Sequence, residues 1–407
     1  MGGQVGGVMR KRRYLAPWRR KAGQGAVAGR DVAVQGREGE ALRALSGKPA
    51  IYHCVSRVVD RRFVLGDAEK EQFVGYMRAY EAFGRLRILT YCVMSNHFHI
   101  LVEVPERPEQ DPSDEELLKH LKVLYAGGEM AEIRRKLGHF RQQGNHPAAE
   151  KLRQRYLSRM WDLSAFMKAL KQRFSQWYNG RNGRDGCLWS ERFKSVLVED
   201  GHAARVMAAY IDLNPVRAGI VKLPERYRWC GYAEAVAGRK KARAGLRWLM
   251  VEKLRTRMSD EEAVREAGEW KRVLDQYQRF LADDEEKRNQ RPDARNQRAG
   301  GMREPKRGEK AMAERSRSFA VPRDGTHGTK KGRTILPPLS ESRMLRCRVR
   351  YFTDGLVLGT KEFVDGVFRL TRKGFGERRK SGARRLACAE TALRTMRALR
   401  VDAYGSG

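Results

Sequence analysis

Two histidines separated by one residue offer the clearest chemistry in this sequence. His97 and His99 lie in the stretch 91–104, which is expected to end in a strand. Side chains alternate along a strand, so both imidazoles project from one face while Phe98, Ile100 and Val102 project from the other. Two imidazoles on one face of a rigid sheet can ligate a divalent metal. The same pair is also compatible with an ordinary half-buried polar face.

Tyr210 and Asn214 supply a second set of chemically useful groups. We expect a helix that ends at about Asn214, because Pro215 disfavours helical dihedrals at the residue before it. Residues four apart on a helix lie one turn from each other on the same face. A phenol and an amide oxygen could then face the histidine strand and provide a nucleophile and a third metal ligand. Taken alone, Tyr210 also fits a half-buried aromatic residue of an amphipathic helix.

The charge of the chain indicates a polyanionic partner. The 407 residues include 84 Lys and Arg but only 49 Asp and Glu, a formal net charge of +35. Binding to phosphates releases condensed counterions, which favours nucleic acid as the partner. No run of about eighteen apolar residues and no apolar signal segment is present, so we expect no membrane association. The scattered cysteines fit a reducing cytoplasm.

The elements that must position these groups follow from the hydrophobic periodicity. We expect a strand at 51–59, a helix from Asp67 to Gly84, a strand at 86–94 and then the histidine strand. This order predicts an α+β domain with a mainly antiparallel sheet flanked by helices. Further along the chain we expect a helix at 163–177, a strand at 188–198 and a helix capped by Asp200 that carries Tyr210.

The remaining segments suggest a division of the chain around this core. Residues 106–158 are highly charged and helical in period, with Ser113 and Glu116 spaced as a capping box, so they are expected to be an insertion. The predicted parts are a basic disordered arm at 1–48, a catalytic domain at 49–238, a helical extension at 239–285, a disordered basic linker at 286–333 and a small basic accessory module at 334–402.

The accessory module has its own predicted elements. A hairpin is expected around Asp354 and Gly355, followed by helices at 360–369 and 387–399. The abundance of arginine and lysine in this stretch suggests that it binds nucleic acid.

Five blocks in one order resemble the single-tyrosine HUH transposases, and most closely the REP-associated tyrosine transposases. These blocks are Ile51–Arg57, Met94–Ile100, Phe166–Phe174, Leu188–Ser195 and Tyr210–Gly219. The resemblance covers about residues 49–238 and is interrupted by the insertion. It implies a palm-like domain of the ferredoxin or RRM type, to which this chain adds a basic C-terminal extension.

The resemblance also implies roles for the residues singled out above. His97, His99 and Asn214 would hold a divalent metal, with Mg²⁺ expected and Mn²⁺ as the alternative. Tyr210 would attack single-stranded DNA beside hairpins formed by palindromic repeats and form a 5′-phosphotyrosine. A monomer and a homodimer are both compatible with this chemistry, and a location in the cytoplasm on nucleoid DNA is expected.

Several basic residues within the matching blocks are candidates for contacts with the DNA backbone, although each also fits a solvated surface. They are Lys168, Lys171, Arg173, Arg192, Lys194 and Arg217. Trp177, Trp189 and Trp229 could stack on bases, but packing in the core is the stronger expectation for each.

Two other functions remain open from the sequence. A DNA- or RNA-binding regulator could keep this fold without turnover, although it would not need the set of His97, His99, Tyr210 and Asn214. A rolling-circle replication initiator would share the chemistry but would more often carry a helicase with a phosphate-binding loop, and the sequence contains no such motif.

Overall fold

The computed structural model describes residues 49–250, 266–282, 345, 351–372, 375, 378–386 and 391–397. The predicted arm at 1–48 and the predicted linker at 286–333 lie outside these residues.

One seven-stranded sheet forms the centre of the described structure, in the order β2-β3-β1-β4-β5-β7-β6. All neighbouring strands are antiparallel except β4 and β5, which are parallel. This confirms the predicted α+β class and the mainly antiparallel sheet. The strands are β1 Ala50–Arg57, β2 Arg87–Val93, β3 His97–Val104, β4 Lys194–Val198, β5 Gly355–Gly359, β6 Arg384–Arg385 and β7 Arg394–Arg397.

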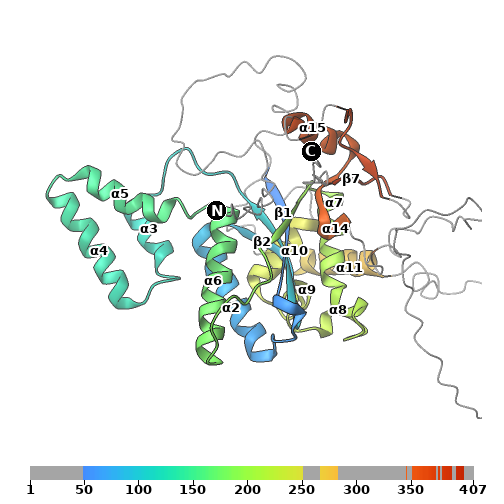
Figure 1. Ribbon diagram of the computed structural model, residues 1–407, viewed down its shortest axis with the longest axis horizontal. Helices are drawn as coiled ribbons and strands as arrows, with labels where there is room; N and C mark the ends of the chain where they lie inside the picture. Colours follow the sequence, from blue (N-terminus) through green and yellow to red (C-terminus); the bar gives the residue numbers. More distant parts are fainter. Residues whose placement is uncertain are drawn as a thin grey trace, which may run out of the picture.

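Helices cover both faces of the sheet, as Figure 1 shows. One face carries α2 Asp67–Gly84, α6 Leu163–Arg181 and α15 Lys361–Leu370. The other carries α7 His202–Asp212, α9 Gly231–Val236, α10 Lys240–Met250 and α11 Glu266–Leu281. The short elements are η1 Val59–Arg61, α8 Asn214–Arg217, η2 Pro224–Arg226 and α14 Tyr351–Asp354. None of the described helices is both long enough and apolar enough to cross a membrane.

The side chains of β3 alternate between the two faces of the sheet. Phe98, Ile100 and Val102 belong to the core under α2 and α6, whereas Leu101 belongs to the core under α7. Because His99 has the parity of Leu101, its side chain lies on the α7 face. The alternation predicted from the sequence therefore places the histidines toward the helix that carries Tyr210.

The insertion at 106–158 forms three helices that lie apart from the sheet (Figure 1): α3 Asp114–Leu121, α4 Gly127–Gln142 and α5 His146–Leu157. They have a small core of their own, which reaches the rest of the protein through Phe83 of α2. The predicted capping box is confirmed, since the Ser113 hydroxyl accepts from the Glu116 backbone N–H and the Glu116 carboxylate accepts from that of Ser113.

Two predictions for the stretch before Tyr210 are wrong in part. The strand predicted at 188–198 begins only at Lys194. Before it, Trp189 forms only an isolated bridge with Val58, and the side chains of Leu188, Trp189 and Phe193 are buried in the core under α2 and α6. The helix that carries Tyr210 is preceded by Gly201, at φ 75°, and has no side-chain cap, so Asp200 does not cap it.

The C-terminal residues differ more strongly from the prediction. Residues 351–354 form the short helix α14, and β5 pairs with β4 and β7, so no hairpin turns at Asp354 and Gly355. The helix predicted at 360–369 is confirmed as α15, capped by Thr360. Part of the helix predicted at 387–399 is instead strand β7. The described part of 334–402 thus extends the central sheet and does not stand as a detached unit.

Close packing of α10 on β2 gives a stability prediction. A Cβ atom at Gly245 would lie 2.6 Å from the Leu89 carbonyl oxygen and 2.7 Å from that of Ile88. Gly245→Ala should therefore lower the free energy of unfolding by roughly 1–3 kcal/mol, measured by chemical denaturation. Gly138→Ala in α4, where a Cβ meets nothing within 4 Å, should leave stability unchanged or raise it. Equal effects of the two substitutions would contradict this packing.

Candidate active site

Three histidines and a tyrosine lie together where β1, β3 and α7 meet. The ring centroid of His99 lies 5.0 Å from that of His97 and 5.1 Å from that of His53. Tyr210 of α7 lies 6.4 Å from both His53 and His99, measured between ring centroids. The structure thus brings the two predicted histidines and the predicted nucleophile into one cluster. It adds His53, which the sequence analysis did not single out.

The hydrogen bond between His53 and His99 fixes the tautomer of His99. The Nδ1 atom of His53 lies 2.7 Å from the carbonyl oxygen of Phe352, which can only accept, so Nδ1 carries the proton. The Nε2 atom of a neutral His53 is then an acceptor, and it lies 2.9 Å from Nδ1 of His99. His99 must donate from Nδ1, and its own Nε2 keeps the lone pair that a metal would need.

His97 is held by an equivalent bond. Its Nδ1 atom lies 2.6 Å from Oδ1 of Asn96, and the amide nitrogen of Asn96 donates to the carbonyl oxygen of Arg61 at 3.0 Å. The second bond assigns the amide orientation, so the Asn96 oxygen faces His97 and accepts from Nδ1. In the neutral tautomer, the lone pair of His97 is also on Nε2.

The surroundings keep the two buried imidazoles neutral. Burial is the main cause that lowers the pKa of His53 to about 4; the hydrogen bond to Phe352 opposes this shift and the charge of Arg217 adds to it. Burial also lowers the pKa of His99 well below its usual value, with further lowering from His97, His53, Arg217 and Arg57. A neutral imidazole is the form that binds a metal.

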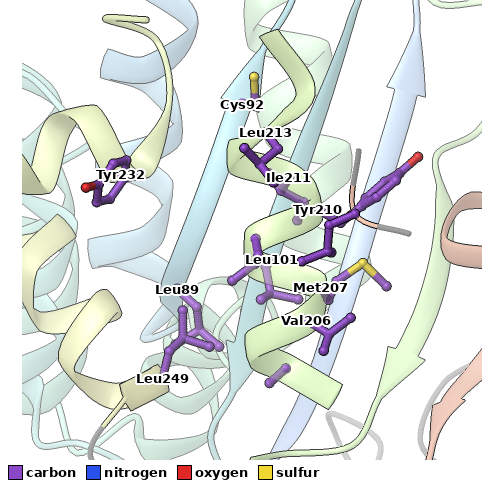
Figure 2. Packing of buried hydrophobic residues seen from close by; sticks show 14 of the residues in the cluster. Leu89, Cys92, Leu101, Val206, Met207, Tyr210, Ile211, Leu213, Tyr232 and Leu249 are labelled. Atoms are coloured by element: carbon purple, nitrogen blue, oxygen red, sulfur yellow. The ribbon is translucent and has the colours of Figure 1, made fainter. Parts of the chain in front are cut away.

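Tyr210 is enclosed by cationic and aromatic groups. The Arg217 guanidinium lies 4.0 Å from its ring centroid and donates to its carbonyl oxygen at 2.7 Å. The ring of Phe352 meets it edge-on at 4.8 Å between centroids, and the tyrosine is only 3% exposed. Figure 2 shows Tyr210 on α7 beside Met207, with Leu101 of the sheet beneath the helix.

The expectation that Tyr210 and Asn214 share one helix is wrong. Helix α7 ends at Asp212, and Asn214 is the half-buried first residue of α8. The break coincides with Pro215, which has no N–H to continue the ladder of hydrogen bonds. The role of Asn214 as third ligand stays a prediction.

A metal at this site would need a donor beyond histidine and carboxylate. Within the described part of the chain, no three or more His, Cys, Asp and Glu side chains are grouped so as to hold a metal ion. By donor type, the Nε2 lone pairs of His97 and His99 could supply two ligands to a divalent ion, and an amide oxygen such as that of Asn214 a third. The donor types present are thus compatible with the predicted metal.

The six basic candidates for DNA contact occupy different environments. Lys168 and Arg173 are exposed on α6, and Arg192 is exposed in the loop before β4. Lys171 donates from Nζ to the Glu191 carbonyl oxygen at 2.8 Å.

The other two candidates are engaged within the protein. Lys194 pairs with Asp354 at 3.2 Å, and Arg217 donates to the carbonyl oxygens of Leu345 and Tyr210. Their contacts with DNA stay predictions.

The three tryptophans are packed in this structure. Trp189 is 5% exposed, and its ring contacts those of Phe73, Phe98 and Phe174. Trp177 and Trp229 are half-buried against the core. The stronger expectation, packing, describes all three.

Asp212, a fully buried carboxylate on α7, was not among the site residues predicted from the sequence. The hydroxyls of Thr90 and Tyr277 each donate to it at 2.6 Å, and the Tyr232 backbone N–H lies at 3.4 Å. Burial raises its pKa to about 7, against the lowering effect of these hydrogen bonds. Asp212 joins the helix of Tyr210 to β2, α9 and α11. Its position two residues after Tyr210 was the available signal, but its donors are distant in sequence.

Residues 48–140 match the family model described as IS200-like transposase. The matched range contains β1, α2, β2 and β3, with His53, His97 and His99, and it ends before Tyr210. For this part of the chain, the resemblance found in the sequence is confirmed. Among solved structures, a REP-associated tyrosine transposase bound to a REP hairpin is similar over 46% of this chain and 80% of that chain, at 15% sequence identity and a TM-score of 0.30. No curated protein matches the chain.

The role of His53 can be tested by metal titration. His53→Phe keeps a ring of similar size but removes the acceptor that holds Nδ1–H of His99, so we expect Mn²⁺ affinity to fall about 10- to 100-fold. Isothermal titration calorimetry measures this, with His139→Phe on the exposed surface of α4 as the control. Unchanged affinity in a folded His53→Phe protein would contradict the positioning role.

The Asp212 network gives a separate prediction. Tyr277→Phe removes one of the two short hydroxyl bonds to a buried carboxyl group, so the free energy of unfolding should fall by about 1–3 kcal/mol in chemical denaturation. The half-buried Tyr76 of α2 serves as the matched site, where Tyr76→Phe should change stability by less than about 0.5 kcal/mol. A Tyr277→Phe protein as stable as the wild type would show that α11 does not depend on this bond.

Proposed function

We propose that this chain is a metal-dependent transposase that cleaves and rejoins single-stranded DNA near palindromic hairpins through a 5′-phosphotyrosine. The observation that carries the proposal is the cluster of His97, His99 and Tyr210. The two histidines lie within residues 48–140, which match the IS200-like transposase family model. The net charge of +35 supports a nucleic acid as the substrate. The hairpin target rests on the resemblance of the five sequence blocks.

The residues suggest a division of labour in strand cleavage. The Tyr210 oxygen attacks the scissile phosphorus, an O–P bond forms, and the bond to the 3′ oxygen breaks to leave a 3′-hydroxyl after protonation. The guanidinium of Arg217, 4.0 Å from the Tyr210 ring centroid, would place a positive charge beside the reacting groups as negative charge develops on them. Mg²⁺ or Mn²⁺ bound by His97, His99 and Asn214 would supply Lewis-acid polarisation of the phosphate.

Rejoining follows from the same linkage. A phosphotyrosine conserves the energy of the phosphodiester, so a 3′-hydroxyl can attack it, release the phenol and restore a DNA strand. No nucleotide cofactor is required, which agrees with the lack of a glycine-rich phosphate-binding motif in the sequence.

The nucleophile is tested with hairpin-bearing single-stranded DNA and Mg²⁺ or Mn²⁺. The wild type should form a covalent protein–DNA adduct, visible as a shifted band in denaturing gels. Tyr210→Phe should lower adduct formation at least about a thousand-fold while DNA binding is retained. Tyr76→Phe, which changes a half-buried tyrosine of α2, should form the adduct as the wild type does.

Two results would overturn parts of the proposal. Equal adduct formation by the wild type and Tyr210→Phe would contradict the choice of nucleophile. Tight binding of the hairpin by the wild type without any adduct would instead favour the non-catalytic regulator.

A further inference from the structure

The loop between β1 and α2 exposes an aromatic side chain beside the candidate site. Phe63 is 82% exposed, whereas the next most exposed large hydrophobic residue of the described chain, Ile220, is 50% exposed. Its neighbours Arg61 and Arg62 are also exposed. Folding does not bury this ring, so the ring is available for contact with a ligand.

The backbone of this loop adopts a conformation that side chains other than glycine rarely take. Asp60 and Arg61 have φ values of 54° and 56°. Bonds to the turn before β3 hold it there: the Asn96 amide donates to the Arg61 carbonyl oxygen at 3.0 Å, and the Leu65 N–H donates to the Ser95 carbonyl oxygen at 2.9 Å. Strained backbone that its surroundings hold in place clusters at active sites, ligand clamps and switch regions.

The same turn holds a predicted metal ligand. Asn96, which binds the Arg61 carbonyl, also accepts from Nδ1 of His97 at 2.6 Å. Arg57, the last residue of β1, lies opposite His97 in the strand register. One amide side chain therefore connects the loop of Phe63 with the imidazole of His97.

Basic groups surround this end of the sheet. The backbone N–H of Ser190 donates to the Arg57 carbonyl oxygen at 3.0 Å, which places the loop containing Arg192 beside the end of β1. Arg61 and Arg62 add two exposed guanidinium groups, and the acidic residues of these two loops are Asp60, Asp185 and Glu191. An exposed aromatic ring among arginines is the arrangement with which proteins bind single-stranded nucleic acid.

We propose that Phe63 stacks on a base of single-stranded DNA held at the His97 end of the sheet, with Arg61 and Arg62 contacting the flanking phosphates. This inference rests on the proposed function, because it takes the DNA strand as the ligand. The stacked base would fix the register of the strand relative to Tyr210. The three tryptophans considered for stacking are packed in this structure, since Trp189 is buried and Trp177 and Trp229 are half-buried against the core.

The test is an abasic scan combined with substitution of Phe63. The full-length protein is titrated, in EDTA to prevent cleavage, with hairpin-bearing oligonucleotides in which one single-stranded nucleotide at a time lacks its base. In the wild type, one abasic position should weaken binding about tenfold. In Phe63→Ala, binding of the intact oligonucleotide should be weaker by the same factor, and that abasic position should cause no further loss.

Two further variants complete the design. Phe63→Trp should restore binding and its sensitivity to the abasic position, because the indole ring also stacks. Val123→Ala, which trims an exposed hydrophobic side chain in the insertion, should keep the abasic profile of the wild type. An abasic profile that is identical in the wild type and Phe63→Ala would overturn the inference.

The outcomes separate this inference from the proposed function. If the oligonucleotides bind but the abasic profile is the same with and without the Phe63 ring, the stacking role fails while cleavage by Tyr210 still stands. If the profile depends on Phe63 but no Tyr210 adduct forms, the stacking role stands and the transposase chemistry fails. If no variant binds the oligonucleotides, both are wrong.

Discussion

The hydrogen-bond chain from the Phe352 carbonyl through His53 to His99 is the constraint on which the site depends. Two adjacent imidazoles buried in a sheet cannot both be charged, and burial lowers the pKa of each. Because the Phe352 carbonyl oxygen can only accept, the hydrogen bonds from it through His53 to His99 allow only one arrangement of protons among neutral rings. That arrangement turns Nε2 of His99 into an acceptor on the face where Tyr210 lies, and Asn96 does the same for His97.

The constraint also links segments that are far apart in the sequence. His53 and Phe352 are 299 residues apart, and Phe352 precedes β5, which adds to the edge of the sheet beside β4. Asp212 connects α7 to α11 through Tyr277, also beyond the region that resembles the transposases. The C-terminal segments that the sequence suggests are accessory therefore supply groups that position the site. Removal of everything after residue 240 would alter the imidazole chain as well as any surface for DNA.

The parts of this structure that follow from local sequence patterns were predictable. The alternation of His97 and His99 with Phe98 and Ile100, the capping box of Ser113, and α15 all depend on neighbours within a few residues. The failures involve distant contacts. Leu188 and Trp189 have the composition of a strand but are buried by aromatic packing, and the residues of β7 have helical composition but pair with β5. His53 and Asp212 gained their roles from partners far along the chain.

The tautomers of His53 and His99 are the decisive observable for this hydrogen-bond chain. Long-range ¹⁵N–¹H correlation spectra of the full-length, metal-free protein labelled with ¹⁵N-histidine report the protonation of each ring nitrogen. At pH 7 we expect neutral rings for His53 and His99, with the proton on Nδ1 and the lone pair on Nε2 in both. A His99 ring protonated on Nε2, or a charged imidazolium at either position, would contradict this expectation.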